Sequence, residues 1–205
     1  VLEGYYLNNR YYTNSSVTIY PSQTWFTTYN ITAVYQTQYL VSINSALPVS
    51  INGTEITSFN NWVNAGSVLG ITANNVTMSN ETLFVPAFYS ETLSINSPIT
   101  LTINWTPYYY VEVTSNYPIN VNGVTTTNYT KWIRSGSQLV ITAKPINELG
   151  GLIILRPNAT SLALTISNPT TITITYTPNY MNLIIVIAAV VIISVAIILF
   201  KVRRH

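Results

Sequence analysis

An internal duplication is the feature that most constrains the fold of this chain. Residues 39–73 read YLVSINSALPVSINGTEITSFNNWVNAGSVLGITA and match residues 109–143, which read YYVEVTSNYPINVNGVTTTNYTKWIRSGSQLVITA. A second match, with one inserted residue, relates SPITLTINWTP at 97–107 to NPTTITITYTP at 168–178. Such repetition indicates tandem modules of about 70 residues. Identical residues at a spacing of 70 include Pro48 and Pro118, Gly53 and Gly123, Trp62 and Trp132, Gly66 and Gly136, Leu69 and Leu139, and Thr72 and Thr142.

Both modules have the pattern of β-strands. Val41 and Ile43 alternate with polar residues, and the same alternation runs through residues 99–103. A period of two is typical of strands with one buried face. The Asn-Gly pairs at 52–53 and 122–123 lie between β-branched residues and predict tight hairpins. We therefore expect an all-β ectodomain of tandem small β-sandwich or β-grasp-like modules.

The turns and strand ends are predicted from glycine and proline. Gly66 and Gly136, each followed by Ser, indicate a second turn in each module. Prolines lack a backbone donor and are expected at strand ends, as at Pro48 and Pro118.

The repeats and the apolar C-terminus predict the division of the chain. We expect an N-terminal β region at 1–38, modules at 39–108 and 109–178, a transmembrane helix at 181–200 and a basic tail at 201–205. The N-terminal region ends in NITAVYQTQY, a partial third copy of the closing strand. Whether this region folds independently or lends strands to the next module is left open by the sequence.

The C-terminal segment predicts a membrane anchor. From Leu183 to Phe200 the chain carries no charge and a single serine. As a helix at about 1.5 Å per residue this run spans about 27 Å, close to the hydrocarbon thickness of a bilayer. Its Ile and Val content would also suit a buried strand pair, but the unbroken length favours the helix. Lys201, Arg203 and Arg204 follow directly and predict a cytoplasmic C-terminus and an external N-terminal part at the cell membrane.

Composition excludes most enzyme classes. Only 7% of residues are charged, Cys is absent, the acidic residues are all Glu, and the one His is His205. The chain therefore offers neither a disulfide framework nor a metal or cofactor site of the usual kind, and we expect no enzyme activity. Glu81 with Glu91, or Glu55 with Glu112, are the remaining carboxylate pairs. The formal charge is +2, without a basic patch for nucleic acid.

N-linked glycosylation is expected on the external part. The first residue is Val1, as in a protein whose signal peptide has been removed. Asn52, Asn75 and Asn80 are the strongest candidates because they fall at predicted turns. The N-x-S/T sequons are at Asn14, Asn30, Asn52, Asn75, Asn80, Asn104, Asn128 and Asn158.

Two pairs of aromatic residues have different predicted roles. Trp62 and Trp132 occupy equivalent positions in the two modules, so we expect them in the module cores. Trp25 and Phe26 have no equivalent and are the candidate contact with a partner protein.

A family resemblance adds to this interpretation. The pattern Y-x-V-x-(I/V), then W-x-x-(A/S)-G-S-x-L-x-I-T-A, then T-(I/V)-x-(W/Y), resembles the tandem β modules of archaeal and bacterial surface proteins. Residues 30–178 are similar to modules of thermopsin-like exported proteins and of S-layer stalk or anchor subunits in crenarchaea. The resemblance implies a surface role in an archaeon, and the scarcity of charged residues suits an acidic exterior. It does not imply acid protease activity, because the chain contains no Asp.

These features predict a structural cell-surface glycoprotein, a membrane-anchored β-rod that anchors or spaces an envelope assembly such as an S-layer. Its partners would be membrane lipid, N-linked glycans and an envelope or lattice protein. One alternative is a single-span accessory subunit of a transport, respiratory or secretion complex, since small residues at Ala188, Ala189, Ser194 and Ala196 allow close helix packing. Another is the envelope glycoprotein of an archaeal virus.

Overall fold

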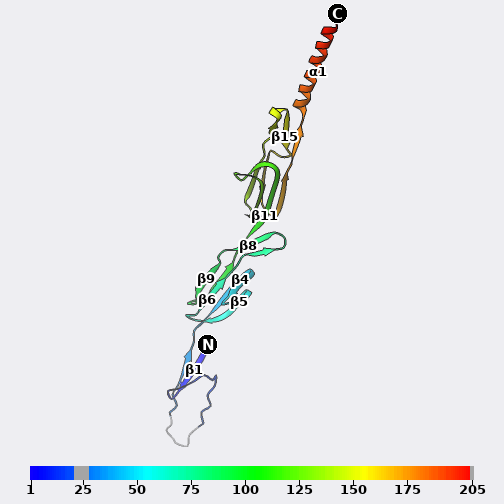
Figure 1. The fold of residues 1–205 in the computed structure, drawn as a ribbon. Helices are drawn as coiled ribbons and strands as arrows, with labels where there is room; N and C mark the ends of the chain where they lie inside the picture. The colour runs from blue at the N-terminus through cyan, green and yellow to red at the C-terminus, as the bar shows by residue number, and fades with distance from the viewer. Residues whose placement is uncertain (21–27, 204–205) are drawn as a thin grey trace. The chain divides into compact units, whose positions relative to one another are not determined.

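The computed structural model describes residues 1–20 and 28–203. The described chain before residue 181 is mostly β-strand, and one long helix, α1 (Met181–Val202), follows it (Figure 1). The expected fold class, an all-β part with one C-terminal helix, is confirmed. The chain divides into two compact units, of which unit 1 comprises Val1–Val76 and Val85–Trp105 and unit 2 comprises Thr77–Phe84 and Thr106–His205.

The N-terminal region forms a small sheet of its own. Its strands β1 (Leu2–Leu7), β2 (Arg10–Tyr12) and β3 (Ile31–Tyr35) are ordered β2-β1-β3, and both pairings are antiparallel. Tyrosine rings face each other across the β1–β2 pair, with Tyr5 stacked on Tyr12 at 5.5 Å between ring centroids. This stacked pair supplies packing contacts in a short sheet that has few aliphatic residues.

Module 1 is built around the long strand β4 (Gln38–Ile51). Along its first half β4 pairs in parallel with β10 (Ile99–Ile103), and near its end it pairs antiparallel with β6 (Val68–Thr72). The hairpin partner β5 (Thr54–Asn64) covers the other edge of β4, while β9 (Ser90–Ser94) pairs with β6.

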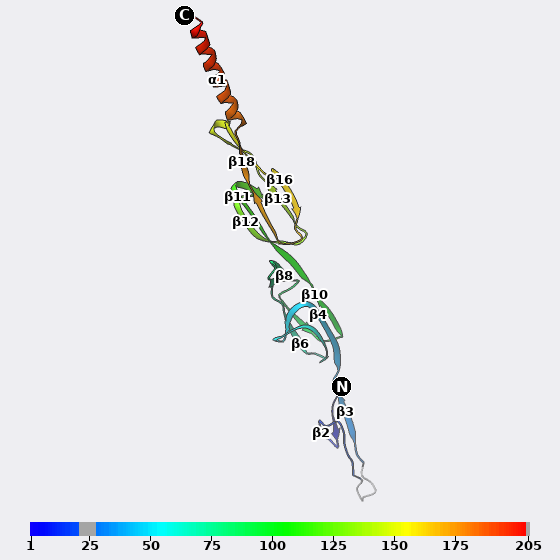
Figure 2. The ribbon, with the colours of Figure 1, turned by 90° about the vertical axis from the view of Figure 1, so that its right-hand side faces the viewer.

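Module 2 repeats this arrangement with equivalent strands (Figure 2). The central strand β11 (Trp105–Val121) pairs in parallel with β17 (Thr170–Ile174) and antiparallel with β12 (Val124–Arg134) and β13 (Gln138–Thr142). Strand β16 (Ser161–Thr165) pairs with β13. The first and last strands of each module therefore lie side by side in the same direction.

Each module also contributes a short hairpin that pairs with the strand leaving the module. Strand β8 (Thr82–Pro86) pairs with β11, and the Tyr110 backbone N–H donates to the Glu81 carbonyl at 3.1 Å. Strand β15 (Ile153–Pro157) pairs antiparallel with β18 (Tyr176–Asn179), which leads into α1. The hairpin elements are β7 (Val76–Met78) with β8 (Thr82–Pro86), and β14 (Ile146–Glu148), the 3-10 turn η1 (Leu149–Gly151) and β15 (Ile153–Pro157) with β18 (Tyr176–Asn179).

The two cores use equivalent apolar positions of the repeat. Val41 and Ile43 in module 1, like Val111 and Val113 in module 2, are at most 1% exposed. The inward face of the central strand is therefore what the period-two pattern predicts. The core of module 1 contains Val41, Ile43, Val49, Ile51, Leu69, Ile71, Ala73, Ile95 and Ile103, and that of module 2 contains Val111, Val113, Ile119, Val121, Tyr129, Leu139, Ile141, Ala143, Ile166 and Ile174.

The predicted turns are confirmed by the backbone. Asn52 and Gly53 have φ values of 49° and 86°, and the Asn-Gly pair at 122–123 repeats them at 47° and 86°. Two successive positive φ values define the hairpin turn that matches strand twist. Gly66 and Gly136 also have positive φ, at 81° and 82°.

Two prolines lie elsewhere than expected. Pro48 and Pro118 lie inside β4 and β11, not at strand ends. In β4 the register with β5 jumps between Asn44 and Val49, and β11 has the same jump between Thr114 and Ile119. A bulge has no ladder partner for the proline to disrupt, so it tolerates a residue without an N–H.

Candidate functional site

The C-terminal helix is the clearest functional element. Residues Met181–Phe200 of α1 have a mean hydropathy of 3.5, and none of their apolar window is buried against the rest of the protein. The one hydroxyl in this stretch, on Ser194, donates to the Val190 carbonyl at 2.7 Å, so it is satisfied within the helix. A helix with apolar side chains on every side needs an apolar surrounding. The helix is therefore a candidate membrane anchor.

The start of α1 is fastened to module 2. Asn179 caps the helix, since its side-chain oxygen accepts from the Met181 N–H at 3.0 Å. The Leu183 N–H donates to the Leu152 carbonyl at 3.1 Å, and the Asn182 side-chain amide donates to the Gly151 carbonyl at 2.9 Å. These bonds satisfy groups of the first turn that a helix leaves unpaired. The β14–β15 hairpin and α1 thus form one hydrogen-bonded joint.

The basic residues after the anchor are only partly described. Lys201 belongs to α1, and Arg203 is exposed, with its N–H donating to the Leu199 carbonyl at 3.1 Å. Arg204 lies outside the described residues. The orientation that these charges predict stays a prediction.

All eight sequon asparagines are exposed, and they are divided between the two units of the chain. The side-chain oxygens of three of them, Asn52, Asn75 and Asn158, accept hydrogen bonds. The Asn52 side-chain oxygen accepts from the Gly70 N–H at 2.8 Å, as its equivalent Asn122 does from Val140. Asn158 accepts from the Thr175 N–H at 3.2 Å. The exposed sequons are Asn14, Asn30, Asn52, Asn75, Asn80, Asn104, Asn128 and Asn158.

The aromatic predictions have different outcomes. Trp25 and Phe26 lie outside the described residues. Placing Trp62 and Trp132 in the module cores was wrong, because their side chains are 65% and 37% exposed. Both lie on the hairpin strands β5 and β12, which pair only with the central strand among the described elements. A strand at a sheet edge can expose large side chains that a central strand would bury.

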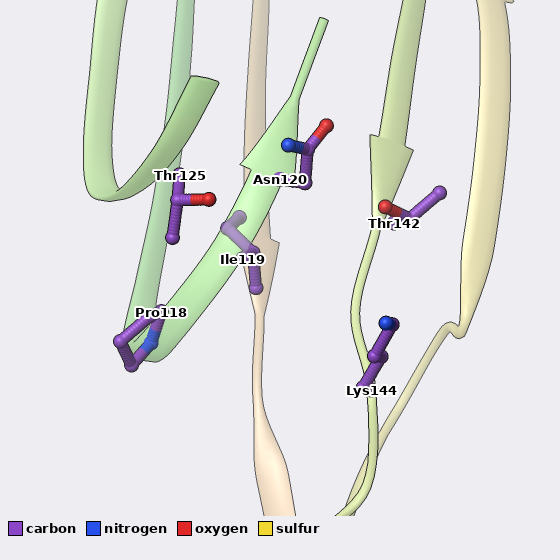
Figure 3. Close-up of a pocket in the computed structure, with 6 residues that line it drawn as sticks. All are labelled: Pro118, Ile119, Asn120, Thr125, Thr142 and Lys144. Carbon is purple, nitrogen blue, oxygen red and sulfur yellow. The ribbon is translucent and has the colours of Figure 1, made fainter. Parts of the chain in front are cut away.

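The modules carry a pair of equivalent hollows that the sequence did not predict. In module 2 a cavity of about 360 Å³ lies between the bulge of β11, strand β12 and the end of β13. Figure 3 shows Asn120 and Thr142 on neighbouring strands, with Lys144 beyond the end of β13. The cavity of module 1, about 290 Å³, has the equivalent place. Both volumes lie near the lower limit of the range for ligand sites, about 300–1,000 Å³. The cavity of module 2 is lined by Pro118, Ile119, Asn120, Thr125, Thr142 and Lys144, and that of module 1 by Pro48, Val49, Ser50, Glu55, Thr72, Asn74, Asn75 and Val76.

The two hollows differ in charge at equivalent positions. Module 1 has Glu55 where module 2 has Thr125, and Asn74 where module 2 has Lys144. Within residues 1–20 and 28–203, neither Glu55 nor Lys144 is joined to an opposite charge. The module 1 hollow also includes Asn75, a sequon residue whose side-chain oxygen accepts from a tyrosine hydroxyl at 3.1 Å. The repeat therefore presents one acidic and one basic version of the same surface.

The members of each carboxylate pair considered from the sequence belong to different units. Glu81 belongs to unit 2 and Glu91 to unit 1, and Glu55 and Glu112 are likewise divided. In the part of the chain that the structure describes, no three acidic or histidine side chains are grouped as metal ligands.

The joint between hairpin and helix was also not anticipated from the sequence. The segment ELGGLI at 148–153 could have indicated it, because the equivalent turn of module 1, SNE at 79–81, has no apolar residue. No family model matches this chain, and no curated protein is significantly similar to it, so the interpretation of these sites depends on their own residues and geometry.

Proposed function

We propose that this chain is a membrane-anchored structural protein of the cell surface, whose tandem β modules anchor or space an envelope assembly such as an S-layer. The membrane helix holds the chain in the bilayer, and the modules present glycosylated, largely uncharged surfaces to neighbouring proteins. No reaction is part of this function, so its mechanism is mechanical.

The observation that carries the proposal is the parallel pairing of the first and last strands of each module. In module 1, β4 and β10 are paired over 41–45 and 99–103, and in module 2, β11 and β17 are paired over 111–115 and 170–174. A pull along the chain enters at the start of the first strand and leaves at the end of the last one. The two strands are then sheared, so all hydrogen bonds between them resist at once. This arrangement suits a protein that transmits tension.

The helix joint supports the same function. Force that reaches α1 passes through β18, which is paired with β15 over residues 176–179. The hydrogen bonds from Asn182 and Leu183 to the hairpin secure the junction at a second place. A tether whose last module was connected by a loose linker would lack such bonds.

Cross-linking mass spectrometry on the native membrane tests this function. Lys131 and Lys144 report on module 2, Glu3 reports on the N-terminal sheet through a carboxyl-reactive reagent, and Lys201 reports on the membrane end. We expect links from the N-terminal sheet or module 2 to one abundant surface protein. A Lys144→Arg variant is the control, because it should lose only the links made through that amine.

Other outcomes would assign the protein to another class. Links confined to Lys201 and to the residues near the helix, with a multi-span protein as partner, would overturn the anchoring function in favour of an accessory subunit. Occurrence of the protein only in infected cells or virions would overturn it in favour of a viral envelope glycoprotein.

A further inference from the structure

The two repeat-equivalent hairpins differ in the chemistry of their tips. The β7–β8 hairpin turns through Ser79, Asn80 and Glu81, all exposed and polar. The β14–β15 hairpin turns instead through Leu149-Gly150-Gly151-Leu152. The tip nearer to α1 in the sequence is thus the apolar one.

Leu149 combines an exposed apolar side chain with a backbone conformation that disfavours leucine. Its side chain is 69% exposed, and its φ is 49°, in the left-handed region that disfavours residues with a Cβ. Gly150 and Gly151 follow with φ values of 66° and 91°, which glycine adopts without strain. An exposed leucine on a strained backbone is a candidate for a contact outside the chain.

The hairpin tip is held level with the first turn of the helix. The carbonyls of Gly151 and Leu152 accept from the Asn182 side chain and the Leu183 N–H at 2.9 and 3.1 Å. Within the hairpin, the Leu152 N–H donates to the Leu149 carbonyl at 3.3 Å. Figure 1 shows this hairpin beside the beginning of α1.

The first turn of α1 lies at the bilayer surface if the helix spans the membrane. Its 20-residue apolar stretch, about 30 Å long, matches the hydrocarbon thickness and leaves little to extend beyond it. Tyr180, Met181 and Ile184 are 48%, 61% and 58% exposed and stand at this level. An aromatic residue followed by aliphatic ones is typical of the interface.

We propose that the hairpin tip, residues Leu149–Leu152, inserts into the membrane interface and is a second lipid contact beside the helix. Its occupant is the boundary between headgroups and acyl chains of the leaflet facing the β modules. The two glycines keep their backbone groups among hydrated headgroups, where these groups still find hydrogen-bond partners. Together the tip and the helix restrain how module 2 tilts on the membrane. This inference rests on the anchoring role of α1 in the proposed function.

The test uses single-cysteine labels on the full chain, which has no native cysteine. Leu149→Cys, Asn80→Cys and Val190→Cys are each labelled with an environment-sensitive fluorophore in lipid nanodiscs. Quenching is measured with nitroxides on the lipid, at the headgroup or deep in the acyl chain, and with aqueous iodide. We expect the Leu149 label to be quenched several-fold more by the shallow lipid nitroxide than the Asn80 label, and to be protected from iodide.

The three labels separate failure of this inference from failure of the anchor. Deep quenching at Val190 with a Leu149 label as open to iodide as the Asn80 label would overturn the tip contact alone. Absence of lipid quenching at Val190 would overturn the membrane anchor and the tip contact with it.

A polar substitution gives an independent measurement. Leu149→Asn keeps the fold, because asparagine tolerates positive φ better than leucine. With the reporter placed at Asn147→Cys, we expect Leu149→Asn to reduce shallow lipid quenching several-fold. Unchanged quenching would show that the tip does not touch lipid through this side chain.

Discussion

The hydroxyl of Tyr176 is the one buried side-chain polar atom without a hydrogen-bond partner in the described part of the chain. The ring itself is well placed, tilted against Tyr117 at 5.1 Å between centroids. An unsatisfied buried hydroxyl costs about 1–3 kcal/mol. We therefore expect Tyr176→Phe to raise the stability of module 2 by about 1 kcal/mol, a rise in Tm of roughly 4–8 °C. Thermal unfolding followed by circular dichroism measures the shift.

The equivalent residue of module 1 provides the matched control. Trp105 occupies the same place in the repeat, but its indole N–H donates to the Ser45 hydroxyl at 3.0 Å. Trp105→Phe should therefore lower stability where Tyr176→Phe raises it. A loss of stability in both variants would mean that the Tyr176 hydroxyl has a partner in solution.

The same tyrosine predicts a weakness at alkaline pH. Burial raises the pKa of Tyr176 above its ordinary value of 10.0 because the charged phenolate is poorly solvated there. The neutral form is favoured in the fold, so its contribution to stability is complete below pH 10 and is lost as the pH rises through the folded-state pKa. We expect the stability difference between Tyr176→Phe and the unchanged protein to widen from pH 9 to pH 11 in denaturant titrations. A constant difference would contradict the shifted pKa.

Asn52 combines a sequon with a structural role, and this affects how its glycosylation is tested. Its positive φ and its bond to the Gly70 N–H make Asn52→Gln destabilising by about 1–2 kcal/mol with or without a glycan. Thr54→Ala abolishes the same sequon and leaves the turn intact. We expect both changes to remove any glycan at this site in gel-shift assays, while only Asn52→Gln lowers the melting temperature of the enzymatically deglycosylated protein. Equal melting temperatures would exclude the structural role.

Among the elements, the parallel pair β11–β17 is expected to determine the mechanical strength of module 2. Cysteines introduced at Tyr108 and Thr175 would pull this pair in shear. Cysteines at Tyr108 and Ser135 would instead open the β11–β12 hairpin from its end, where Tyr108 pairs with Arg134. Shear loads all bonds together, and opening from the end loads them one by one. We expect a several-fold higher unfolding force for the first attachment in optical-tweezer measurements.

Equal forces in the two directions would contradict a load-bearing role for the parallel pair. A second comparison uses a proline in each of two strands of module 2. Thr173→Pro alters β17, whose residue 173 faces Thr114, and Ala163→Pro alters β16, which pairs only with β13 among the described strands. We expect the first variant to lose most of the shear resistance and the second to retain it.

The elements differ in how far the sequence predicts them. The Asn-Gly turns and the inward faces of β4 and β11 follow from local rules, because φ preferences and alternation are properties of adjacent residues. Pairing partners are not local. The parallel contact of β4 with β10 and the edge position of β5, which exposes Trp62, depend on segments far apart in the chain. A strand bonded on one edge has the same sequence pattern as a central strand, so the sequence alone predicts Trp62 in the core.

Only part of the candidate site can be predicted from the sequence. An apolar run without charge must find an apolar surrounding wherever it lies, so α1 follows from residues 183–200 alone. The hairpin tip and the paired hollows could not be found in this way. The hollow of module 2 forms where the Pro118 bulge lies beside the end of β13, and the hairpin tip is bonded to the first turn of α1. In both places only the fold brings the two segments together.

At the scale of the whole molecule, the scarcity of charge predicts stability in acid. Charged residues make up 7% of the chain, and among the side chains of residues 1–20, 28–200, 202 and 203 no ion pair is formed. Acid unfolds most proteins by protonating carboxylates that stabilise the fold through pairing. Here the fold depends on apolar cores and backbone ladders, which do not titrate. We expect the melting temperature in nanodiscs to differ by less than about 5 °C between pH 7 and pH 3, the shift that ~1 kcal/mol produces.

A Thr171→Lys variant provides the control, because it places an ammonium opposite Glu112 across the β11–β17 pair. This variant should lose stability in acid, where the unchanged protein does not. A much larger drop for the unchanged protein would mean that its six Glu side chains stabilise the fold as carboxylates, and would remove the physical basis for placing it on an acidic exterior.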